Sequence, residues 1–351
     1  MRLLPPAAPL LIAHRGASGI RPEHTLAGYE LAARMGADYL EPDLVATSDG
    51  VLVARHEPEI GATTDIAEHP ELADRHTTKI IDGERVSGWF VEDLTLAELR
   101  SLRARERIPL LRPRNTFFDR RYPVPTFDEI LELRARLSAE LGREIGVYPE
   151  TKHPTYFASL GSPLEPPLVA ALNRAGLNRP DAPVFVQSFE TGNLRALREV
   201  LRVPLVQLLY AEGAPADLVA AGDPRGYADL ATPDGLAGIA GYADAIGPQK
   251  DQVIARAPDQ SLAEPTGLVE EAHAAGLQVH AYTFRNENQF LPTNLRSGGV
   301  ESDHGDSAAE YAAFFAAGLD GVFTDHTDAA FAARARCLDP IPAERSSAVR
   351  G

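Results

Sequence analysis

Residues 10–46 read LLIAHRGASGIRPEHTLAGYELAARMGADYLEPDLVA, and this stretch decides the fold. Two apolar runs, Leu10–His14 and Tyr39–Ala46, have the length and composition of buried strands. A helical pattern at His24–Met35 lies between them. A parallel connection between neighbouring strands needs a dozen or more residues, and a helix of this length provides them. The stretch therefore predicts a βαβ unit.

The alternation of short apolar runs and helical patterns continues along the chain. Further candidate strands lie at Ile145–Glu150, Val184–Ser188, Leu205–Leu209, Ala245–Gly247, Val279–Phe284 and Gly321–Thr324. Further candidate helices lie at Thr126–Leu141, Glu165–Ala175, Thr191–Leu201, Pro265–Ala275 and Ser307–Ala317. Eight strands with intervening helices predict an α/β fold, a closed (β/α)8 TIM barrel. A doubly wound open sheet is the alternative, because a count of strands does not establish closure.

Two segments depart from this repeat. The run Val51–Glu57 follows Tyr39–Ala46 after only four turn residues, so the two runs must pair as an antiparallel hairpin. Residues 58–125 are too many for a βα loop and predict an inserted subdomain on one face of the barrel. We therefore expect a single barrel domain at 8–335 that contains this subdomain, followed by a C-terminal tail at 336–351.

Charge and composition limit the partners and the location of the protein. The chain has 34 Lys and Arg against 50 Asp and Glu, a formal charge of −16, which argues against a nucleic-acid-binding surface. Cys337 is the only cysteine, so no intramolecular disulfide forms. No apolar run reaches 18 residues, and we expect no transmembrane segment. We read Leu3–Ala13, with its three prolines, as the approach to the first strand rather than a signal peptide. We expect a cytoplasmic protein, or a periplasmic or secreted one if a leader was removed upstream.

Acidic and histidine side chains gather where strands end. Glu41 and Asp43 are two residues apart on one strand and point to the same side. Two charges this close are costly without a neutralising cation, although a solvated edge strand is the alternative. The hairpin brings His56 approximately opposite Asp43, and His14 ends the neighbouring strand. Because the carboxyl ends of barrel strands meet at one mouth, these four residues predict an active site.

The third parallel strand ends in Tyr148-Pro149-Glu150-Thr151-Lys152 and adds an acid and a base to this mouth. Together with the two acids of the second strand, Glu150 makes an all-oxygen ligand set, which suits Ca²⁺ or Mg²⁺ rather than Zn²⁺. Lys152 is placed to bind an anion beside the metal, or to form a salt bridge with Glu150. Arg15, in the glycine-containing loop after His14, offers a planar fork that matches phosphate oxygens.

This set of motifs resembles the glycerophosphodiester phosphodiesterase family. The likeness runs in order from about residue 10 to 330 and rests on His14-Arg15-Gly16-Ala17, Pro22-Glu23-x-Thr25, Glu41-x-Asp43, His56, Glu150-x-Lys152, Gln187-Ser188-Phe189 and Tyr282-Thr283-Phe284-Arg285. The 58–125 segment is also similar to the insertion of the larger bacterial and plant members. The resemblance implies a TIM barrel of the phosphatidylinositol-phospholipase-C-like type. It also implies metal-dependent hydrolysis of a small-molecule glycerophosphodiester to sn-glycerol 3-phosphate and an alcohol.

The resemblance implies a role for each matched residue. These are general acid and base for His14 and His56, divalent-metal ligands for Glu41, Asp43 and Glu150, phosphate contacts for Arg15 and Lys152, and the glycerol end of the pocket for Phe189 and Tyr282. The chain has His24 where the family usually has Asn, and Tyr282 where it usually has Trp. We expect His24 to change the hydrogen bonding that holds His14, and Tyr282 to change how the pocket accepts its alcohol.

Two other functions remain open at this point. One is a related barrel phosphodiesterase that acts on lysophospholipid or sphingomyelin-like substrates. The other is a non-catalytic phosphodiester-binding protein on the same fold, although a binding protein has no need of both proton-transfer histidines. Which histidine is the acid, and whether water or the adjacent glycerol hydroxyl attacks first, also remain open.

Two charged stretches have simpler interpretations. Eight arginines between Arg100 and Arg121 predict a solvated helix face whose side chains lie over the insertion, with a phosphate-funnelling or membrane-binding surface as the alternative. The stretch Asp303-His304-Gly305-Asp306 has the composition of a metal site, but its position between a strand and a helix favours an ordinary polar loop.

Overall fold

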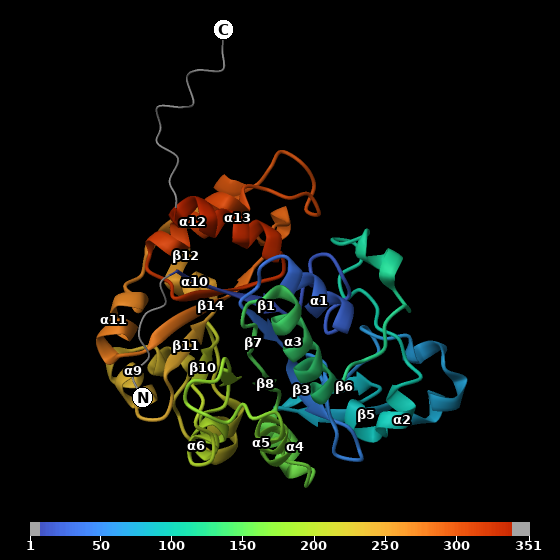
Figure 1. The fold of residues 1–351 in the computed structure, drawn as a ribbon. Helices are drawn as coiled ribbons and strands as arrows, with labels where there is room; N and C mark the ends of the chain where they lie inside the picture. The colour runs from blue at the N-terminus through green and yellow to red at the C-terminus, as the bar shows by residue number, and fades with distance from the viewer. Residues whose placement is uncertain (1–7, 339–351) are drawn as a thin grey trace.

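The computed structural model describes residues 8–338. In this part of the chain, parallel strands occupy eight positions around a closed barrel, and two of these positions hold a strand that is divided in two (Figure 1). β1 pairs in parallel with β15 on one side and with β2 on the other, so the first and last strands are neighbours. The α/β TIM-barrel prediction is confirmed, and the open sheet is excluded. The barrel strands are β1 (Leu10–His14), β2 (Tyr39–Glu41), β3 (Asp43–Ala46), β7 (Gly146–Val147), β8 (Glu150–Thr151), β9 (Val186–Ser188), β10 (Leu205–Leu209), β11 (Ala245–Pro248), β14 (Gln278–Phe284) and β15 (Gly321–Thr324).

Pro42 interrupts the second barrel strand. Proline has no backbone N–H to give to a neighbouring strand, and the strand is divided into β2 and β3 on either side of it. The next strand is divided in the same way into β7 and β8, around Tyr148 and Pro149. Beyond the break, Asp43 lies directly opposite Glu150 in the parallel register. The two prolines thus mark the level at which the carboxylates meet.

Helices surround the barrel (Figure 1). Shorter 3₁₀ turns lie in the loops. The α-helices are α1 (Leu26–Arg34), α2 (Leu96–Leu99), α3 (Phe127–Leu141), α4 (Pro154–Ser159), α5 (Glu165–Arg174), α6 (Thr191–Arg198), α7 (Ala216–Ala221), α8 (Tyr227–Leu230), α9 (Pro233–Ile239), α10 (Lys250–Val253), α11 (Leu268–Ala275), α12 (Ser307–Ala316) and α13 (Thr327–Leu338). The 3₁₀ turns are η1 (Ile66–Glu68), η2 (Pro70–Arg75), η3 (Val91–Asp93), η4 (Asn115–Phe118), η5 (Asn288–Phe290) and η6 (Thr293–Leu295).

The start and the end of α3 follow from its sequence. The Thr126 side chain accepts from the Glu129 N–H, and the Glu129 side chain accepts from the Thr126 N–H, a reciprocal pair that satisfies two of the free donors of the first turn. Gly142 ends the helix with φ +64°. Ile130 and Leu137 are buried on the face that packs inward, with the spacing of a 3.6-residue period.

Three strand pairings are antiparallel, one at the edge of the barrel and two outside it. β4 (Leu52–Ala54) pairs antiparallel with β3, which confirms the predicted hairpin. β5 (Thr77–Ile81) and β6 (Glu84–Gly88) form a two-stranded sheet within residues 58–125, and in Figure 1 they lie with α2 at one side of the barrel. β12 (Ile254–Arg256) pairs with β13 (Leu262–Pro265). The division into a barrel domain at 8–335 with a subdomain at 58–125 stays a prediction.

Several elements differ from the predicted ones. Pro265 was predicted to begin a helix, but it ends β13, and α11 begins only at Leu268. Helices α7 to α9, between β10 and β11, were not predicted, because helices of four to seven residues are too short to show a clear period. α13 continues to Leu338, so the predicted tail at 336–351 begins inside a helix, and its residues 339–351 lie outside the described residues.

Aromatic side chains fill the inside of the barrel. Tyr148 stacks on Phe185 with ring centroids 4.9 Å apart, and it meets Phe323 edge-on at 5.1 Å. Ile12, Val206 and Ala245 complete this cluster, and all six side chains are buried. Each burial of a side chain larger than alanine stabilises the fold by about 1.5–3 kcal/mol. Because Phe323 also lines the cavity at the barrel mouth, the cluster is the floor of that cavity.

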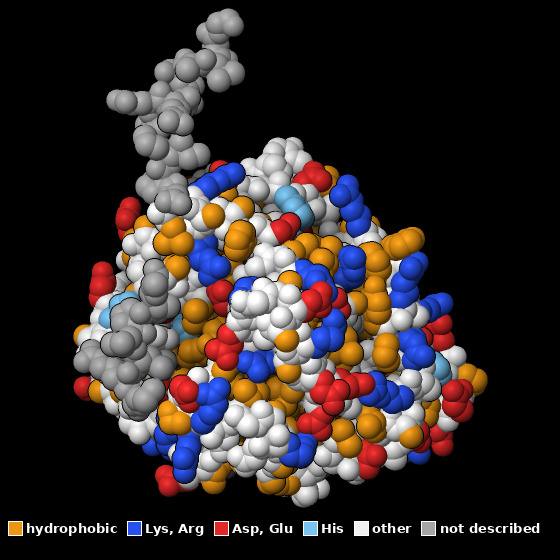
Figure 2. Space-filling model, in the orientation of Figure 1, with side chains coloured by type: hydrophobic (Ala, Val, Ile, Leu, Met, Phe, Trp, Pro, Cys, Tyr) orange, Lys and Arg blue, Asp and Glu red, His pale blue; other side chains and the backbone are white. Residues whose placement is uncertain are grey.

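The outer surface carries charges of both signs. On the face shown in Figure 2, Lys and Arg side chains are interspersed with Asp and Glu, so no continuous basic surface covers this face of the described residues. Within residues 8–338, no helix has both the length and the apolar character that a membrane span requires.

Candidate active site

Three buried carboxylates meet at the carboxyl ends of the barrel strands. Glu41 ends β2, Asp43 begins β3 and Glu150 begins β8. One oxygen of each lies within 4.8 Å of the others, and the three residues are at most 5% exposed. The structure therefore brings together the three residues that the sequence analysis assigned to a metal.

Without a bound cation, these three carboxylates repel one another. Burial and the two neighbouring carboxylates raise the pKa of Glu41 well above its usual range. Burial raises the pKa of Glu150 to about 8, against the opposing effect of Lys152. Burial also disfavours the charged form of Asp43, but Lys152 and His56 hold the pKa of that carboxyl well below its usual range. Among the described residues, Asp43 Oδ1 has no hydrogen-bond partner. A buried oxygen cluster with one unpaired acceptor fits a hard divalent cation.

His14 lies at the end of β1 and is held by a residue from the far end of the chain. Its Nδ1 lies 2.6 Å from Asp325 Oδ1, so Nε2 is the ring nitrogen left for proton transfer. Burial and the nearby Arg15 lower the pKa of His14 to about 4. The imidazole is therefore neutral near pH 7 and can accept a proton at Nε2.

His56 follows β4 and faces the same cavity. The register places Arg55, not His56, opposite Asp43, because the Arg55 N–H donates to the Asp43 carbonyl at 3.0 Å. His56 therefore lies one residue further along than the hairpin prediction placed it. Its Nδ1 bonds to Glu57, and its Nε2 lies 3.3 Å from Lys152 Nζ. Burial and the positive charges of Arg15 and Lys152 lower its pKa.

Two cations lie among the acids. Arg15 has φ +59°, an uncommon value for a residue with a side chain. This conformation lets its N–H donate to Glu41 Oε2 at 2.7 Å, while its guanidinium lies 3.4 Å from Asp43 Oδ2. Lys152 Nζ lies 2.9 Å from Glu150 Oε1, so the salt bridge that was an alternative for Lys152 is present.

A cavity of about 470 Å³ opens over these groups. Its lining includes His14, Arg15, Glu41, His56, Glu150, Phe189 and Tyr282. Asp43 and Lys152 lie behind this lining, and they contact it through Arg15 and His56 respectively.

Aromatic rings form one wall of the cavity. Phe189 stacks on Tyr210 with ring centroids 4.3 Å apart, and it meets Tyr282 edge-on at 6.0 Å. The Tyr282 hydroxyl donates to the Leu209 carbonyl at 2.8 Å, so this hydroxyl is already used within the protein. Tyr210 was not among the predicted site residues. Its signal was its position just after β10, at the same level as Phe189 after β9.

His24, the other residue that departs from the family pattern, contacts a carboxylate and not His14. His24 is fully buried and has φ +52°. Its Nε2 lies 2.9 Å from Asp43 Oδ2, and its Nδ1 lies 2.7 Å from the Tyr29 hydroxyl. The expected effect on the hydrogen bonds of His14 is therefore wrong, and His24 instead orients Asp43.

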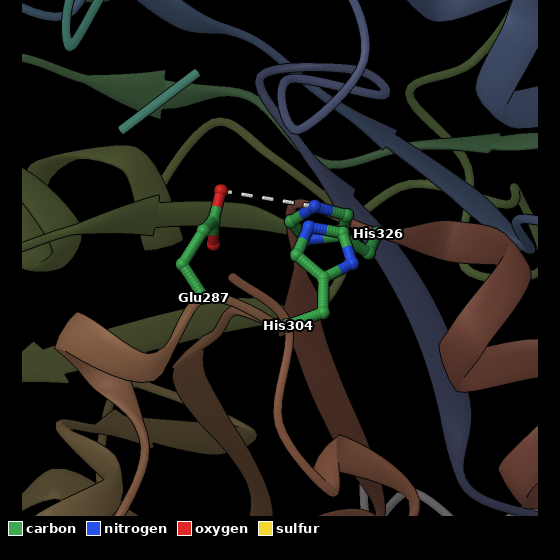
Figure 3. A group of neighbouring side chains, drawn as sticks. All are labelled: Glu287, His304 and His326. Carbon is green, nitrogen blue, oxygen red and sulfur yellow. Dashed lines mark ion pairs between the residues drawn. The ribbon is translucent and has the colours of Figure 1, made fainter. Parts of the chain in front are cut away.

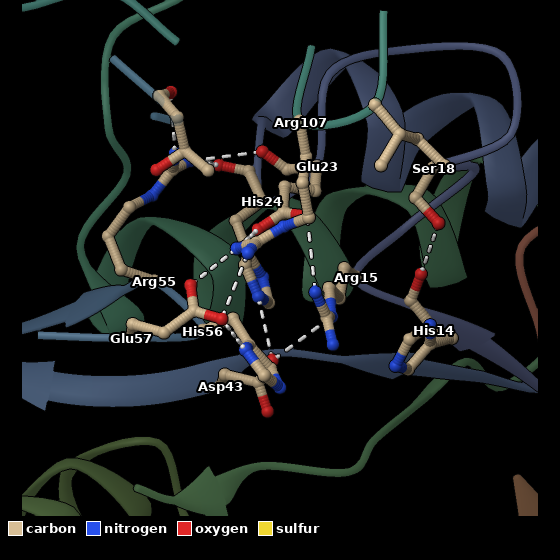
Figure 4. Close-up of polar contacts among 12 residues, drawn as sticks. His14, Arg15, Ser18, Glu23, His24, Asp43, Arg55, His56, Glu57 and Arg107 are labelled. Carbon is tan, nitrogen blue, oxygen red and sulfur yellow. Dashed lines mark hydrogen bonds and ion pairs between the residues drawn. The ribbon is translucent and has the colours of Figure 1, made fainter. Parts of the chain in front are cut away.

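Arg107, from the 58–125 segment, joins two acids beside the site (Figure 4). Its guanidinium makes two hydrogen bonds of 2.6 Å to Glu23 and bonds of 2.9 and 2.6 Å to Glu57. Glu23 also accepts from Arg15 at 3.2 Å, and Glu57 holds the ring of His56. This segment thus orients both a phosphate-binding candidate and a histidine.

Arg112 makes a second buried link to the site. It lies 2.6 Å from Glu287 and 2.6 Å from Asp325, the partner of His14. Arg107 and Arg112 are in loops rather than on a helix, and Arg112 is only 7% exposed. For these two residues the prediction of a solvated helix face is wrong, because their partners lie in other parts of the barrel.

A parallel barrel with two histidines and a carboxylate cluster at its mouth has the kinds of group that phosphodiester hydrolysis needs, side chains able to transfer protons and a cluster suited to a divalent cation. The model of the Glycerophosphoryl diester phosphodiesterase family matches residues 14–329, and the chain belongs to this family. It is a phosphoric diester hydrolase.

Individual relatives agree with this assignment. A glycerophosphodiester phosphodiesterase of Arabidopsis thaliana is 33% identical over 332 residues, which cover 91% of this chain and 84% of that one. One from Haemophilus influenzae is 30% identical over 338 residues, or 86% and 89% of the two chains. An Oleispira antarctica phosphodiesterase, solved in complex with the product sn-glycerol 3-phosphate, has the same fold. Its TM-score is 0.58 at 20% identity, over 93% of this chain and 96% of that one.

Proposed function

We propose that this protein hydrolyses glycerophosphodiesters to sn-glycerol 3-phosphate and an alcohol, with a bound Ca²⁺ or Mg²⁺ and with His14 and His56 as general acid and base. The observation that carries the proposal is that both histidines line one cavity with Glu41 and Glu150. The family membership and the named activity of the relatives support the substrate class.

The metal would be held by Glu41, Asp43 and Glu150. All three ligands are carboxylates, and Ca²⁺ and Mg²⁺ prefer oxygen ligands. The raised pKa values of Glu41 and Glu150 and the unpaired Asp43 Oδ1 describe a site that lacks positive charge. When bound, the ion neutralises non-bridging phosphate oxygens and orients the phosphate.

The two histidines transfer protons at their Nε2 atoms. The nucleophile, water or the glycerol hydroxyl next to the phosphate, gives its proton to one neutral imidazole. The other histidine acts as the imidazolium, with a proton on both ring nitrogens, and gives its Nε2 proton to the leaving alkoxide oxygen. Each transfer contributes typically ~10²–10⁴-fold. Asp325 and Glu57 hold the Nδ1 atoms, which leaves Nε2 of each ring for proton transfer, and Lys152 Nζ lies 3.3 Å from Nε2 of His56.

Positive charge and apolar surface position the two parts of the substrate. Arg15 and Lys152 offer donors to the phosphate, where negative charge builds in the transition state. Phe189 and Tyr282 form an aromatic wall of the same cavity, which gives the glycerol carbons an apolar surface. Lys152 also lies 5.6 Å from the centre of the Phe189 ring, so the phosphate side and the glycerol side adjoin.

Product identification tests the proposal. Glycerophosphocholine and glycerophosphoethanolamine are incubated with the protein and Ca²⁺ or Mg²⁺, and the products are separated. We expect sn-glycerol 3-phosphate with free choline or ethanolamine. Glycerol with phosphocholine would show cleavage of the other ester bond and contradict the proposal. Faster turnover of lysophosphatidylcholine or sphingomyelin would favour the lipid-substrate alternative, and no turnover of any of them would favour a binding protein.

A further inference from the structure

A second group of potential metal ligands lies in the loops that follow β14 and β15. Glu287, His304 and His326 each offer one ligand atom, and the three atoms lie within 4.8 Å of one another. In Figure 3 the carboxylate and the two imidazoles point toward a shared space. We propose that these three residues bind a transition-metal ion of the Zn²⁺ class. The inference does not depend on the proposed hydrolysis.

The donor atoms set this site apart from the carboxylate cluster. Two imidazole nitrogens and one carboxylate oxygen favour Zn²⁺, Ni²⁺ or Cu²⁺, whereas three carboxylates favour Ca²⁺ or Mg²⁺. Three protein ligands leave a fourth position for water, as in zinc sites that are not fully closed by the protein. The two sites of this chain should therefore select different metals.

Two buried atoms in the group have no hydrogen bond to satisfy them. Glu287 is 1% exposed and His326 is 2% exposed. Within residues 8–338, Glu287 Oε2 and His326 Nε2 have no hydrogen-bond partner. Arg112 occupies only the other oxygen of Glu287, at 2.6 Å, and His326 Nε2 lies 3.8 Å from that oxygen. Leaving buried polar atoms unpaired costs about 1–3 kcal/mol each, and a bound cation would remove this cost for Glu287 Oε2. The Asn286 N–H donates to His326 Nδ1 at 3.4 Å, so Nε2 carries the proton of the neutral ring and must release it when the ion binds.

The backbone holds the ligands in place without a metal. Glu287 and His304 face each other across an antiparallel bridge. Hydrogen bonds on both sides support this bridge, one from Asn288 N–H to Asp303 O at 2.7 Å and one from Gly305 N–H to Asn286 O at 3.0 Å. The rings of His304 and His326 have centroids 5.0 Å apart. The site is therefore largely formed in advance.

A small movement completes the coordination. Ligand atoms about 2 Å from a tetrahedral metal lie within about 3.5 Å of one another. The three atoms here lie within 4.8 Å of one another, so the group has to contract only where a pair exceeds that separation. His304 is the exposed member of the three, and its side chain is the one with room to move inward.

Metal binding would tie the loop after β14 to the end of β15. This loop also carries Phe290, Leu291 and Arg296, which line the cavity over the active site. His326 directly follows Asp325, the partner of His14. An ion at this position would therefore fix one wall of the cavity.

Zn²⁺ binding by the full-length protein tests the proposal. The protein is freed of metals with a chelator, the chelator is removed, and Zn²⁺ is titrated by calorimetry in saturating Ca²⁺. The variants are His304→Ala, Glu41→Gln for the carboxylate cluster, and His76→Ala as a matched surface histidine outside both groups. Co²⁺ is the spectroscopic probe, because its visible absorption reports nitrogen and oxygen ligands and their geometry.

We expect one Zn²⁺ to bind the parent, Glu41→Gln and His76→Ala with equal affinity. His304→Ala should bind it at least about tenfold more weakly and lose the Co²⁺ spectrum, with an unchanged melting temperature in chelator. Equal Zn²⁺ affinity of His304→Ala and the parent would overturn the proposal. Loss of Zn²⁺ binding in Glu41→Gln would do so as well, because the ion would then occupy the carboxylate cluster. If His304→Ala is unstable, the same titration on His326→Gln decides between these outcomes.

Discussion

His14 Nδ1 lies 2.6 Å from Asp325 Oδ1, although the two residues are 311 positions apart in the chain. β1 and β15 are neighbours in the closed barrel, and this closure brings the two side chains together. Asp325 also accepts from Arg112 and Arg285, and these positive charges, with His14, hold its pKa well below its usual range against the effect of burial. Asp325 therefore stays ionised and fixes the proton of His14 on Nδ1.

Replacing this carboxylate by an amide should lower activity without unfolding the protein. In Asp325→Asn the amide no longer fixes the His14 tautomer, so kcat should fall by about 10²-fold or more, within the range of a lost proton-transfer group. The measurement is kcat for a glycerophosphodiester together with the melting temperature.

Asp320→Asn is the matched control for this change. Asp320 is also a buried aspartate that contacts a histidine, His273, at 2.8 Å, but it precedes β15 instead of following it. Its variant should keep the parent's kcat. Equal losses of kcat in the two variants would show that the effect of Asp325 is structural.

Replacing Arg107, whose guanidinium bonds both Glu23 and Glu57, should disturb the positions of His56 and Arg15 together. Arg107→Gln leaves Glu23 and Glu57 with weaker partners, and the free energy of unfolding should fall by about 1–3 kcal/mol. We expect kcat to fall at least about tenfold, because Glu57 no longer holds the ring of His56 in one orientation. Arg107→Lys should be intermediate, because an ammonium cannot bond both acids in the same planar geometry.

Arg105→Gln is the control for this prediction. Arg105 lies two residues away and makes a more exposed ion pair with Glu68 at 3.6 Å. Steady-state kinetics should show no loss in this variant. A parent-like kcat in Arg107→Gln would contradict the positioning role.

The buried histidine of the barrel core should make the protein acid-sensitive. Burial lowers the pKa of His280 from 6.5 to about 4. In this window the unfolded chain takes up a proton that the native state does not, so stability is lost as the pH falls from 6.5 toward 4. The free energy of unfolding at pH 5 should be about 2 kcal/mol lower than at pH 7 because of this one group.

Denaturant unfolding of His280→Gln at pH 7 and pH 5 checks this. The free energy of unfolding should change less between pH 7 and pH 5 in this variant than in the parent, by up to about 2 kcal/mol. Tyr148→Phe removes the 2.7 Å hydrogen bond to the ring and keeps the titrating group, so it should retain most of the parent's pH dependence. An unchanged pH dependence in His280→Gln would contradict the assignment.

The aromatic wall should affect substrate binding more than chemistry. Phe189→Ala removes the ring that stacks on Tyr210, and KM for glycerophosphocholine should rise about tenfold while kcat changes less than about threefold. Phe331→Ala, at an exposed phenylalanine on α13, is the control and should leave both constants unchanged. A fall in kcat alone for Phe189→Ala would argue against a binding role.

The sequence was sufficient to predict the barrel and the carboxylates. Each depends on local spacing: a strand, a helix and a strand in order, or two acids two residues apart. The Thr47–Gly50 turn predicted the hairpin for the same reason, but the exact register, with Arg55 opposite Asp43, depends on contacts that the turn does not determine.

The groups that orient the site were harder to predict. Asp325, Arg107 and Arg112 act on residues from other parts of the chain, so no local period or motif marks them. The high arginine content of 100–121 favoured a solvated surface, because most arginines are exposed. Only the closure of the barrel shows that two of these side chains reach inward.

The most direct test of the account is a metal-dependence assay on four proteins: the parent, His14→Ala, His56→Ala and Glu41→Gln. Release of sn-glycerol 3-phosphate from glycerophosphocholine is measured after chelation and again after Ca²⁺ or Mg²⁺ is restored. The parent should lose activity with chelator and recover it with metal. The histidine variants should stay at least ~10²-fold slower with metal present, and Glu41→Gln should recover only at higher metal concentration or not at all. Full activity of the parent in chelator, or of His14→Ala in metal, would contradict the central claim.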